Sequence, residues 1–250
     1  TPDHNMLIRK WNQEKQTLDD NYQLVPANRL GWYAGLMSRV KYDGSMPENS
    51  YVLKGVEHKQ KPQREDCSIE MNLWMKFIGI YLAEGTLLYR ERVRKHYIIQ
   101  ISAVKDRERQ YIIKLLESMK LNYLALKDRF IINNKRLYFA IAELGLEGIK
   151  APHKFVPYFA FRQSAEAIKC LIEGHFMGDG CEQYGCRSHY TSSRKLADDL
   201  QRLYFLSGTQ SSITVREPRR SVMRAGAPAR LGWERDPCYA AARIKAMSKE

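Results

Sequence analysis

The chain has 250 residues, 44% of them hydrophobic and 28% charged, a composition typical of a globular protein. No apolar run approaches the ~20 residues of a membrane span, and no signal segment opens the chain. Its five cysteines are scattered, which argues against a disulfide framework. We therefore expect an intracellular, cytoplasmic protein.

The net charge of +13 is unevenly distributed. Residues 1–66 hold 10 of the 41 Lys and Arg and 9 of the 28 Asp and Glu, which leaves 31 and 19 in residues 67–250. A basic excess of this size is typical of proteins that bind nucleic acid, although ordinary basic solubility would give the same charge.

The first 66 residues are expected to differ from the rest. Short apolar stretches at 22–25 and 32–37, separated by proline and glycine, predict a mainly-β segment over residues 1–45. Residues 46–66 are polar, contain two prolines and are expected to be a linker.

Two similar successions of elements follow, which we assign to residues 67–150 and 151–250. The first is expected to contain a helix at 67–84 capped by Asp66 or Ser68, strands at 87–92 and 97–102, a helix at 105–119, strands at 123–126 and 130–132, and a short helix at 137–144. The second is expected to contain a helix at 164–177, a hairpin around 184–185, a helix at 194–206 and a strand at 212–216. A unit seen twice indicates internal duplication and pseudo-twofold symmetry.

The first helix of each unit ends in a similar nine-residue motif, residues 77–85 (FIGIYLAEG) and 172–180 (IEGHFMGDG). Each motif has small residues four apart, and these lie on one helix face. They are Gly79 and Ala83 in the first motif and Gly174 and Gly178 in the second. Small residues let two helix backbones approach closely, so we expect the two helices to pack together with Glu84 and Asp179 side by side.

Two neighbouring carboxylates repel each other unless a cation joins them. Hard oxygen ligands favour Mg²⁺, or another divalent cation such as Mn²⁺, which also takes phosphate oxygens. A metal held in this way suits phosphodiester hydrolysis. A single Ala-Glu-Gly at a helix end is ordinarily only a helix terminus, so the prediction depends on the repetition.

The paired motifs resemble those of the two-motif LAGLIDADG homing endonucleases, the kind often found inside inteins. The resemblance covers roughly residues 70–217 and includes two further blocks, Lys154-Phe-Val-Pro157 and residues 191–203 (TSSRKLADDLQRL). It implies a monomeric α+β fold in which two αββαββα units form a β-saddle over the major groove of double-stranded DNA.

The resemblance also implies roles for residues. Glu84 and Asp179 would bind the metal ions, and Lys154 would be the catalytic lysine near the scissile phosphate, where a cation stabilises developing charge. The alternative for Lys154 is a surface lysine before a proline-containing loop.

Basic residues on the strands that follow each motif are the candidates for reading DNA. Residues two apart in a strand share one face, and Arg pairs with guanine edges or with phosphates. The candidates are Arg90, Arg92, Arg94, Arg187, His189, Arg216, Arg219, Arg220 and Arg224. For each of them the alternative is a solvated charge.

Thr1 and His4 resemble the intein block in which a threonine and a histidine assist an acyl shift. No cysteine or serine precedes Thr1, and the last five residues lack the His-Asn pair, so we expect no splicing by the chain as given. The alternative is an ordinary β segment.

Three functions are therefore weighed. The leading one is a metal-dependent, site-specific DNA endonuclease. The second is a cleavage-inactive DNA-binding regulator or RNA-splicing maturase of the same fold, and the third is a splicing domain. Cys181, Cys186 and His189 lack a regularly spaced fourth ligand, so zinc is disfavoured, and His175 is expected to be packed or at the surface.

Overall fold

The computed structural model describes residues 5–30, 34–37, 39–40, 42–56, 65–91, 95–183, 186–216 and 241–247, the last segment and residue 216 as backbone only. The chain forms two compact units, Thr1–Val40 and Lys41–Glu250. Among the described helices, none is long and apolar enough to cross a membrane.

The first unit is a small antiparallel sheet. Its central strand β1 (Asn5–Asn12) pairs with β2 (Thr17–Leu18), β3 (Gln23–Pro26) and β4 (Ala34–Leu36). A 3-10 turn, Ala27–Arg29, follows β3. Thr1 and His4, which resemble splicing residues, lie outside the described part of the chain.

The expected linker contains a strand, so that prediction is wrong in part. Strand β5 (Ser50–Leu53) pairs with β6 (Cys67–Glu70), and helix α1 (Met71–Glu84) begins four residues later than expected. Leu53 is buried against the core, and the Tyr51 ring stacks on Trp74 at 4.2 Å. These long-range contacts, rather than local polarity, decide the conformation here.

The first repeat follows the expected order of elements. After α1 come β7 (Gly85–Glu91), β8 (Lys95–Ser102), α2 (Asp106–Ser118), β9 (Leu124–Ala125), β10 (Arg129–Asn133) and α3 (Lys135–Ile141). The strands form an antiparallel sheet in the order β7-β8-β10-β9. A π-helical segment (Ala142–Leu146) and 3-10 turns at Ala151–His153 and Tyr158–Arg162 lead to the second repeat.

The second repeat has the same topology. It contains α4 (Ala165–Asp179), β11 (Gly180–Gln183), β12 (Cys186–Thr191), α5 (Arg194–Leu206), β13 (Ser211–Arg216) and β14 (Ala241–Met247). Its sheet order is β11-β12-β14-β13, which matches the first sheet position for position. The predicted α+β class and the predicted duplication are therefore confirmed, and β14 is a strand that the sequence did not predict.

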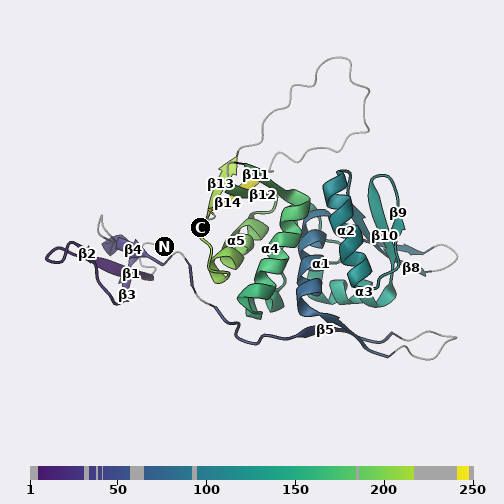
Figure 1. Ribbon diagram of the computed structural model, residues 1–250, viewed down its shortest axis with the longest axis horizontal. Coiled ribbons are helices and arrows are strands. Elements are labelled where there is room, and N and C mark those ends of the chain that lie inside the picture. Colours follow the sequence, from purple (N-terminus) through teal and green to yellow (C-terminus); the bar gives the residue numbers. More distant parts are fainter. Residues whose placement is uncertain are drawn as a thin grey trace, which may run out of the picture. The chain divides into compact units, whose positions relative to one another are not determined.

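Helices α1 and α4 run side by side at the centre of this unit, with α2 and α3 beyond α1 and α5 beyond α4 (Figure 1). Helix α1 is apolar nearly all round, as a helix enclosed by other elements must be. Its buried side chains include Trp74, Met75, Phe77, Ile78 and Ile80. This buried pair of helices fixes where the two motifs end.

Candidate functional site

The α1–α4 contact is made backbone to backbone. A methyl group added at Gly79 would stand 2.2 Å from the carbonyl oxygen of Leu171, and one added at Gly174 would stand 2.2 Å from that of Lys76. Both distances are far below van der Waals contact, so only glycine fits at either position. The structure thus places both glycines at the contact that the small-residue pattern predicted.

The same contact continues to the motif ends. A methyl group at Gly178 would stand 2.6 Å from Cβ of Ala83 and 3.0 Å from Cγ of Glu84. Because Asp179 directly follows Gly178, the two acids leave the helix pair at the same end. Each is followed by a glycine that starts a strand, so both carboxylates lie where a helix meets its sheet.

Burial governs the electrostatics of the acid pair. It raises the pKa of Glu84, and it raises the pKa of Asp179 to about 7, where the negative charge of Glu84 contributes further. A neighbouring cation would lower both values again. The described residues contain no cluster of three or more His, Cys, Asp or Glu side chains able to hold a metal ion. Two carboxylates alone suit Mg²⁺, which keeps several water ligands and takes phosphate oxygens.

Lys154 is buried at the end of α1, with 7% of its surface exposed. Its ammonium donates hydrogen bonds to the carbonyl oxygens of Tyr81 (3.2 Å), Ala83 (3.4 Å) and Gly85 (3.0 Å). Burial lowers its pKa to about 8, against the attraction of Asp179 and Glu84. Lys154 therefore binds three carbonyl oxygens around the last turn of α1, where helix carbonyls have fewer backbone partners.

The loop that carries Lys154 is tied to the second repeat. The hydroxyl of Ser193, the N-cap residue of α5, donates to the Lys154 carbonyl oxygen at 2.6 Å. The Val156 amide donates to the Asp199 carboxylate at 3.0 Å. The block that includes Lys154 thus connects the end of α1 with the start of α5 and fixes where the lysine lies.

Two charged residues near the acids were missed by the sequence analysis. Glu108, in the first turn of α2, is 6% exposed, and its carboxylate lies 2.7 Å from the ammonium of Lys105. Its negative charge raises the pKa of both Glu84 and Asp179. The only sequence signal was a glutamate three residues after a helix N-cap, which indicates a capping box rather than a site.

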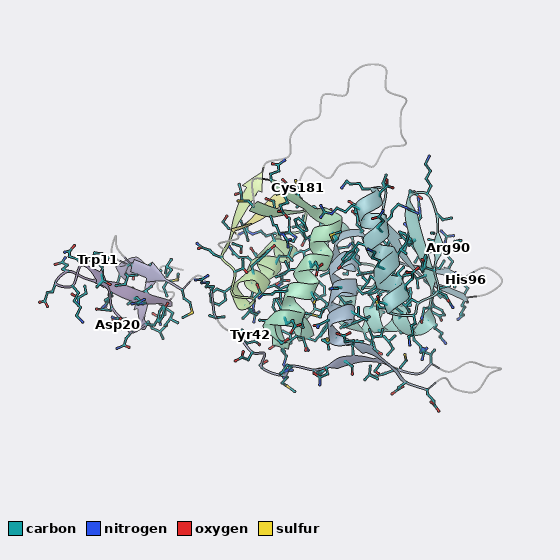
Figure 2. All side chains as sticks on the ribbon, viewed as in Figure 1. Trp11, Asp20, Tyr42, Arg90, His96 and Cys181 are labelled. Atoms are coloured by element: carbon teal, nitrogen blue, oxygen red, sulfur yellow. The ribbon has the colours of Figure 1, made fainter. Side chains whose placement is uncertain are left out.

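The outer face of the first sheet carries polar and basic side chains. Leu87 and Ile99 pair across the strands and point into the core, so the alternate residues point away from the helices. Arg90 pairs with His96 on this outer face, and both lie at the same end of the sheet (Figure 2). Arg92 and Arg94 lie outside the described residues.

Two further side chains of this face escaped the sequence analysis. Arg129 of β10 donates a hydrogen bond to the Gln100 side chain of β8 at 3.3 Å. The sequence predicted a strand at 97–102, which contains Gln100, but it did not show that β10 runs beside β8. Together with Arg90 they give the outer face hydrogen-bonding groups of the kind that read base edges.

The prediction that His189 contacts DNA is wrong. His189 is fully buried, 3.1 Å from the His175 ring nitrogen Nδ1 and 2.6 Å from the Tyr204 hydroxyl. Arg187 lies on the same strand face, as predicted, but its side chain is 54% exposed, pairs with Glu182 at 3.2 Å and lies 4.9 Å from the Phe176 ring, so its contact with DNA stays a prediction. The two-residue alternation of a strand correctly predicted that these side chains share one face of the sheet. It did not predict whether this face is turned to the helices or to solvent, because tertiary packing decides that.

The remaining predicted DNA contacts lie at the C-terminal end of β13. Arg216 is the last residue of β13, and its side chain is not described. Arg219, Arg220 and Arg224 lie outside the described residues. They stay predictions.

No family model matches the chain. The proteolytic subunit of the ATP-dependent Clp protease of Chlamydomonas moewusii is 24% identical over 228 residues, which are 85% of this chain and 22% of that protein. The RNA polymerase subunit Rpo1C of Methanocaldococcus jannaschii is 28% identical over 203 residues, which are 72% of this chain and 21% of that protein. The chain thus spans about a fifth of the length of the curated relatives it matches.

Two solved structures are similar in fold. I-DmoI in complex with DNA and calcium is 12% identical with a TM-score of 0.49, covering 70% of this chain and 83% of that one. The N-terminal LAGLIDADG domain of WhiA is 9% identical with a TM-score of 0.38, covering 70% and 75%. These likenesses are distant, so the description of the fold rests on the repeated topology of the chain itself.

Proposed function

We propose that this chain is a monomeric, site-specific endonuclease of the homing type that cuts both strands of a long DNA target with Mg²⁺ or Mn²⁺. The observation that carries the proposal is the acid pair. Two repeats of one topology bring Glu84 and Asp179 to the same end of one helix pair, at the junction with two sheets. Since one chain supplies both acids, no second copy is needed.

The acid pair would hold the metal, which would lower the pKa of a bound water and neutralise phosphate charge. In the reaction a water oxygen forms a bond to phosphorus, the bond from phosphorus to the leaving oxygen breaks, and one proton of the water ends on that oxygen. Glu84 and Asp179 are fixed for this task by the backbone contact of α1 and α4. Preorganised charges of this kind are the main source of catalysis in phosphoryl transfer.

The outer sheet faces would contact the major groove. Arg90, Gln100 and Arg129 offer donors and an acceptor on the exposed side of the first sheet. A two-stranded or larger β surface fits the width of the groove. The net charge of +13 supports the same partner, because phosphates provide most of the affinity of such complexes.

We further propose that the chain is encoded within an intein. Two proteins named for different activities, a protease subunit and a polymerase subunit, each match this chain over about a fifth of their length. A segment shared in this way behaves as an insertion rather than as the part that performs either activity. The position of Thr1 and His4 before the endonuclease unit supports the same origin.

The test uses a duplex made by joining the DNA on either side of the coding segment, incubated with Mg²⁺ and then with EDTA. Specific double-strand cutting that requires the metal would support the proposal. Glu84→Gln and Asp179→Asn should each abolish cutting of at least one strand and leave binding intact. Tight binding without cutting under both conditions would instead favour a DNA-binding regulator, and binding to RNA alone would favour a maturase.

A further inference from the structure

The ammonium of Lys154 has no hydrogen bond left to give to a substrate. A lysine has three N–H donors, and the structure directs them to the three carbonyl oxygens of Tyr81, Ala83 and Gly85 at the end of α1. Withdrawing them would break three hydrogen bonds, two of them buried, at the end of α1, which is costly. Lys154 is therefore suited to holding the helix end, and with it Glu84, in place.

A second lysine lies at the same end of the sheet. Strand β8 runs antiparallel to β7 with Ile101 opposite Gly85, so the chain beyond Ser102 returns to the point where Glu84 leaves α1. Lys105, the N-cap residue of α2, stands three residues further on.

The first turn of α2 also contacts the end of α4. The Arg107 guanidinium lies 3.4 Å from the sulfur of Met177 and 5.3 Å from the Phe176 ring centroid. These two residues are two and three positions before Asp179. The turn that begins at Lys105 is thus placed against the ends of both motif helices.

The environment of Lys105 is the reverse of that of Lys154. Its side chain is 75% exposed, yet it is held by the Glu108 carboxylate, whose side chain is 8% exposed and 2.7 Å away. This pair uses one N–H and leaves two donors. The hydrogen bond with Glu108 raises the pKa of Lys105, and the charges of Glu84 and Asp179 act in the same direction.

We propose that Lys105 is the catalytic residue that contacts the reacting phosphate, that Glu108 positions it, and that Lys154 is a positioning residue for the end of α1. This inference rests on the proposed endonuclease function. As water adds to phosphorus and the bond to the leaving oxygen breaks, negative charge grows on the phosphate oxygens. The two remaining donors of Lys105 would stabilise that charge, and the leaving oxygen takes its proton from the water.

The N-cap and third positions of α5 do not repeat this pair, although another exposed lysine and buried acid of that helix, Lys195 and Asp199, form an ion pair. Lys105 and Glu108 are the N-cap and third residues of α2, and the same positions of α5 hold Ser193 and Leu196. Ser193 is already bonded to the Lys154 carbonyl oxygen, and Leu196 is buried. The two strands of the target would therefore depend unequally on Lys105, and its loss should give nicked DNA.

The experiment compares Lys105→Met, Lys105→Met with Glu108→Gln, Lys154→Met and the control Lys114→Met. Lys114 is exposed on the same helix, more than two turns away. The double variant avoids leaving Glu108 buried as an unpaired charge. The first measurement needs no metal: affinity for duplex DNA in EDTA as a function of salt, beside the melting temperature of each protein.

We expect both Lys105 variants to lower the slope of log affinity against log salt by about 0.9, the loss of one phosphate contact. Lys154→Met and Lys114→Met should keep the wild-type slope, and of these two variants Lys154→Met should melt clearly lower. In strand-resolved single turnovers with Mg²⁺, loss of Lys105 should slow one strand on the order of 100-fold and leave a nicked product. Lys105→Arg should restore much of the rate.

The inference is overturned if both Lys105 variants keep the wild-type salt slope and cut both strands at the wild-type rates. It is also overturned if Lys154→Met lowers the slope and keeps its melting temperature, because Lys154 would then be the phosphate contact. Failure of the proposed function is distinguishable, since in that case the wild-type protein itself does not cut the target.

Discussion

Substituting Gly174 by alanine tests the contact on which the acid pair depends. The added methyl carbon would stand 2.2 Å from the Lys76 carbonyl oxygen and 3.1 Å from the Ile80 amide nitrogen, whereas ordinary contact begins at 3.4 Å. The neighbouring atoms are backbone, so no side-chain rotation relieves the overlap. Helices α1 and α4 would have to separate locally by about 1.2 Å, the difference between 3.4 and 2.2 Å.

Two opposing contributions determine how much Gly174→Ala changes the stability of the protein. Forcing extra volume into a close-packed interior costs about 1–3 kcal/mol and occasionally more. Alanine is the better helix former by about 1 kcal/mol. Because the overlapping atoms belong to a rigid backbone, we expect the upper end of this cost to apply. The free energy of unfolding of the variant should therefore be about 2–3 kcal/mol lower than that of the wild-type protein. For a unit of this size that is a fall in melting temperature of roughly 5–10 °C.

Thermal and urea unfolding of Gly174→Ala beside the wild-type protein would measure this loss. The matched control is a double-mutant cycle at the next contact, where a methyl at Gly178 meets the Cβ of Ala83 at 2.6 Å. Gly178→Ala should destabilise alone, and Ala83→Gly added to it should recover part of the loss, with a coupling of about 0.5–2 kcal/mol. Wild-type stability in Gly174→Ala would refute the reasoning, because the helices would then not be in backbone contact.

The remaining predictions concern buried ionisable groups. The pKa of Asp179 is raised to about 7 in the folded chain, so without metal the stability should fall as pH rises from about 4 to 7. Asp179→Asn should reduce that fall to the part that buried Glu84 contributes. Mg²⁺ should raise the melting temperature of the wild-type protein at pH 8 and have little effect on Asp179→Asn, as differential scanning fluorimetry would show. The pKa of His189 is lowered to about 3, so the second repeat should lose stability as pH falls below 6.5. Replacing His175, His189 and Tyr204 by Ile, Ile and Leu should reduce this loss of stability in acid. Melting curves at pH 7 and 4.5 would measure the difference.

The sequence was sufficient to predict an element where its capping residue and its apolar spacing lie within the element itself. Helix α5 has the predicted bounds because Ser193 caps it through the Leu196 amide at 3.1 Å, and its apolar residues recur at helical spacing. The helix pair was predictable for a related reason. Small residues four apart, repeated before two acids, have few uses other than a close helix contact.

Other elements depend on partners that are distant in sequence. Residues 67–70 extend into β6 because β5 pairs with them, and 241–247 become a strand between β12 and β13. An alanine-rich stretch such as Ala241–Met247 has no strong preference for strand, so only the open position in the sheet decides its conformation. The surroundings of Lys105 and Lys154 were equally inaccessible, because exposure and hydrogen-bond partners follow from tertiary packing.

The two repeats have kept one feature and changed another. Three core positions correspond in the two repeats: one directly follows the first glycine of the motif, one lies opposite the first residue of the next strand, and one has the same place along the second helix. In this order, the residues are Ile80, Ile101 and Leu116 in the first repeat and His175, His189 and Tyr204 in the second. A side-chain core tolerates such exchange when the new polar groups bond one another, as they do here along His175, His189 and Tyr204.

The α1–α4 contact tolerates no such exchange, because its partners are backbone atoms that cannot change with sequence. The glycines therefore recur in both motifs, while the helix that follows each motif's hairpin starts differently: its N-cap and third residues are Lys105 and Glu108 in α2 and Ser193 and Leu196 in α5. The symmetry that brings the two acids together thus lies in the backbone contact of α1 and α4, and the differences between the two repeats lie in the side chains around that contact.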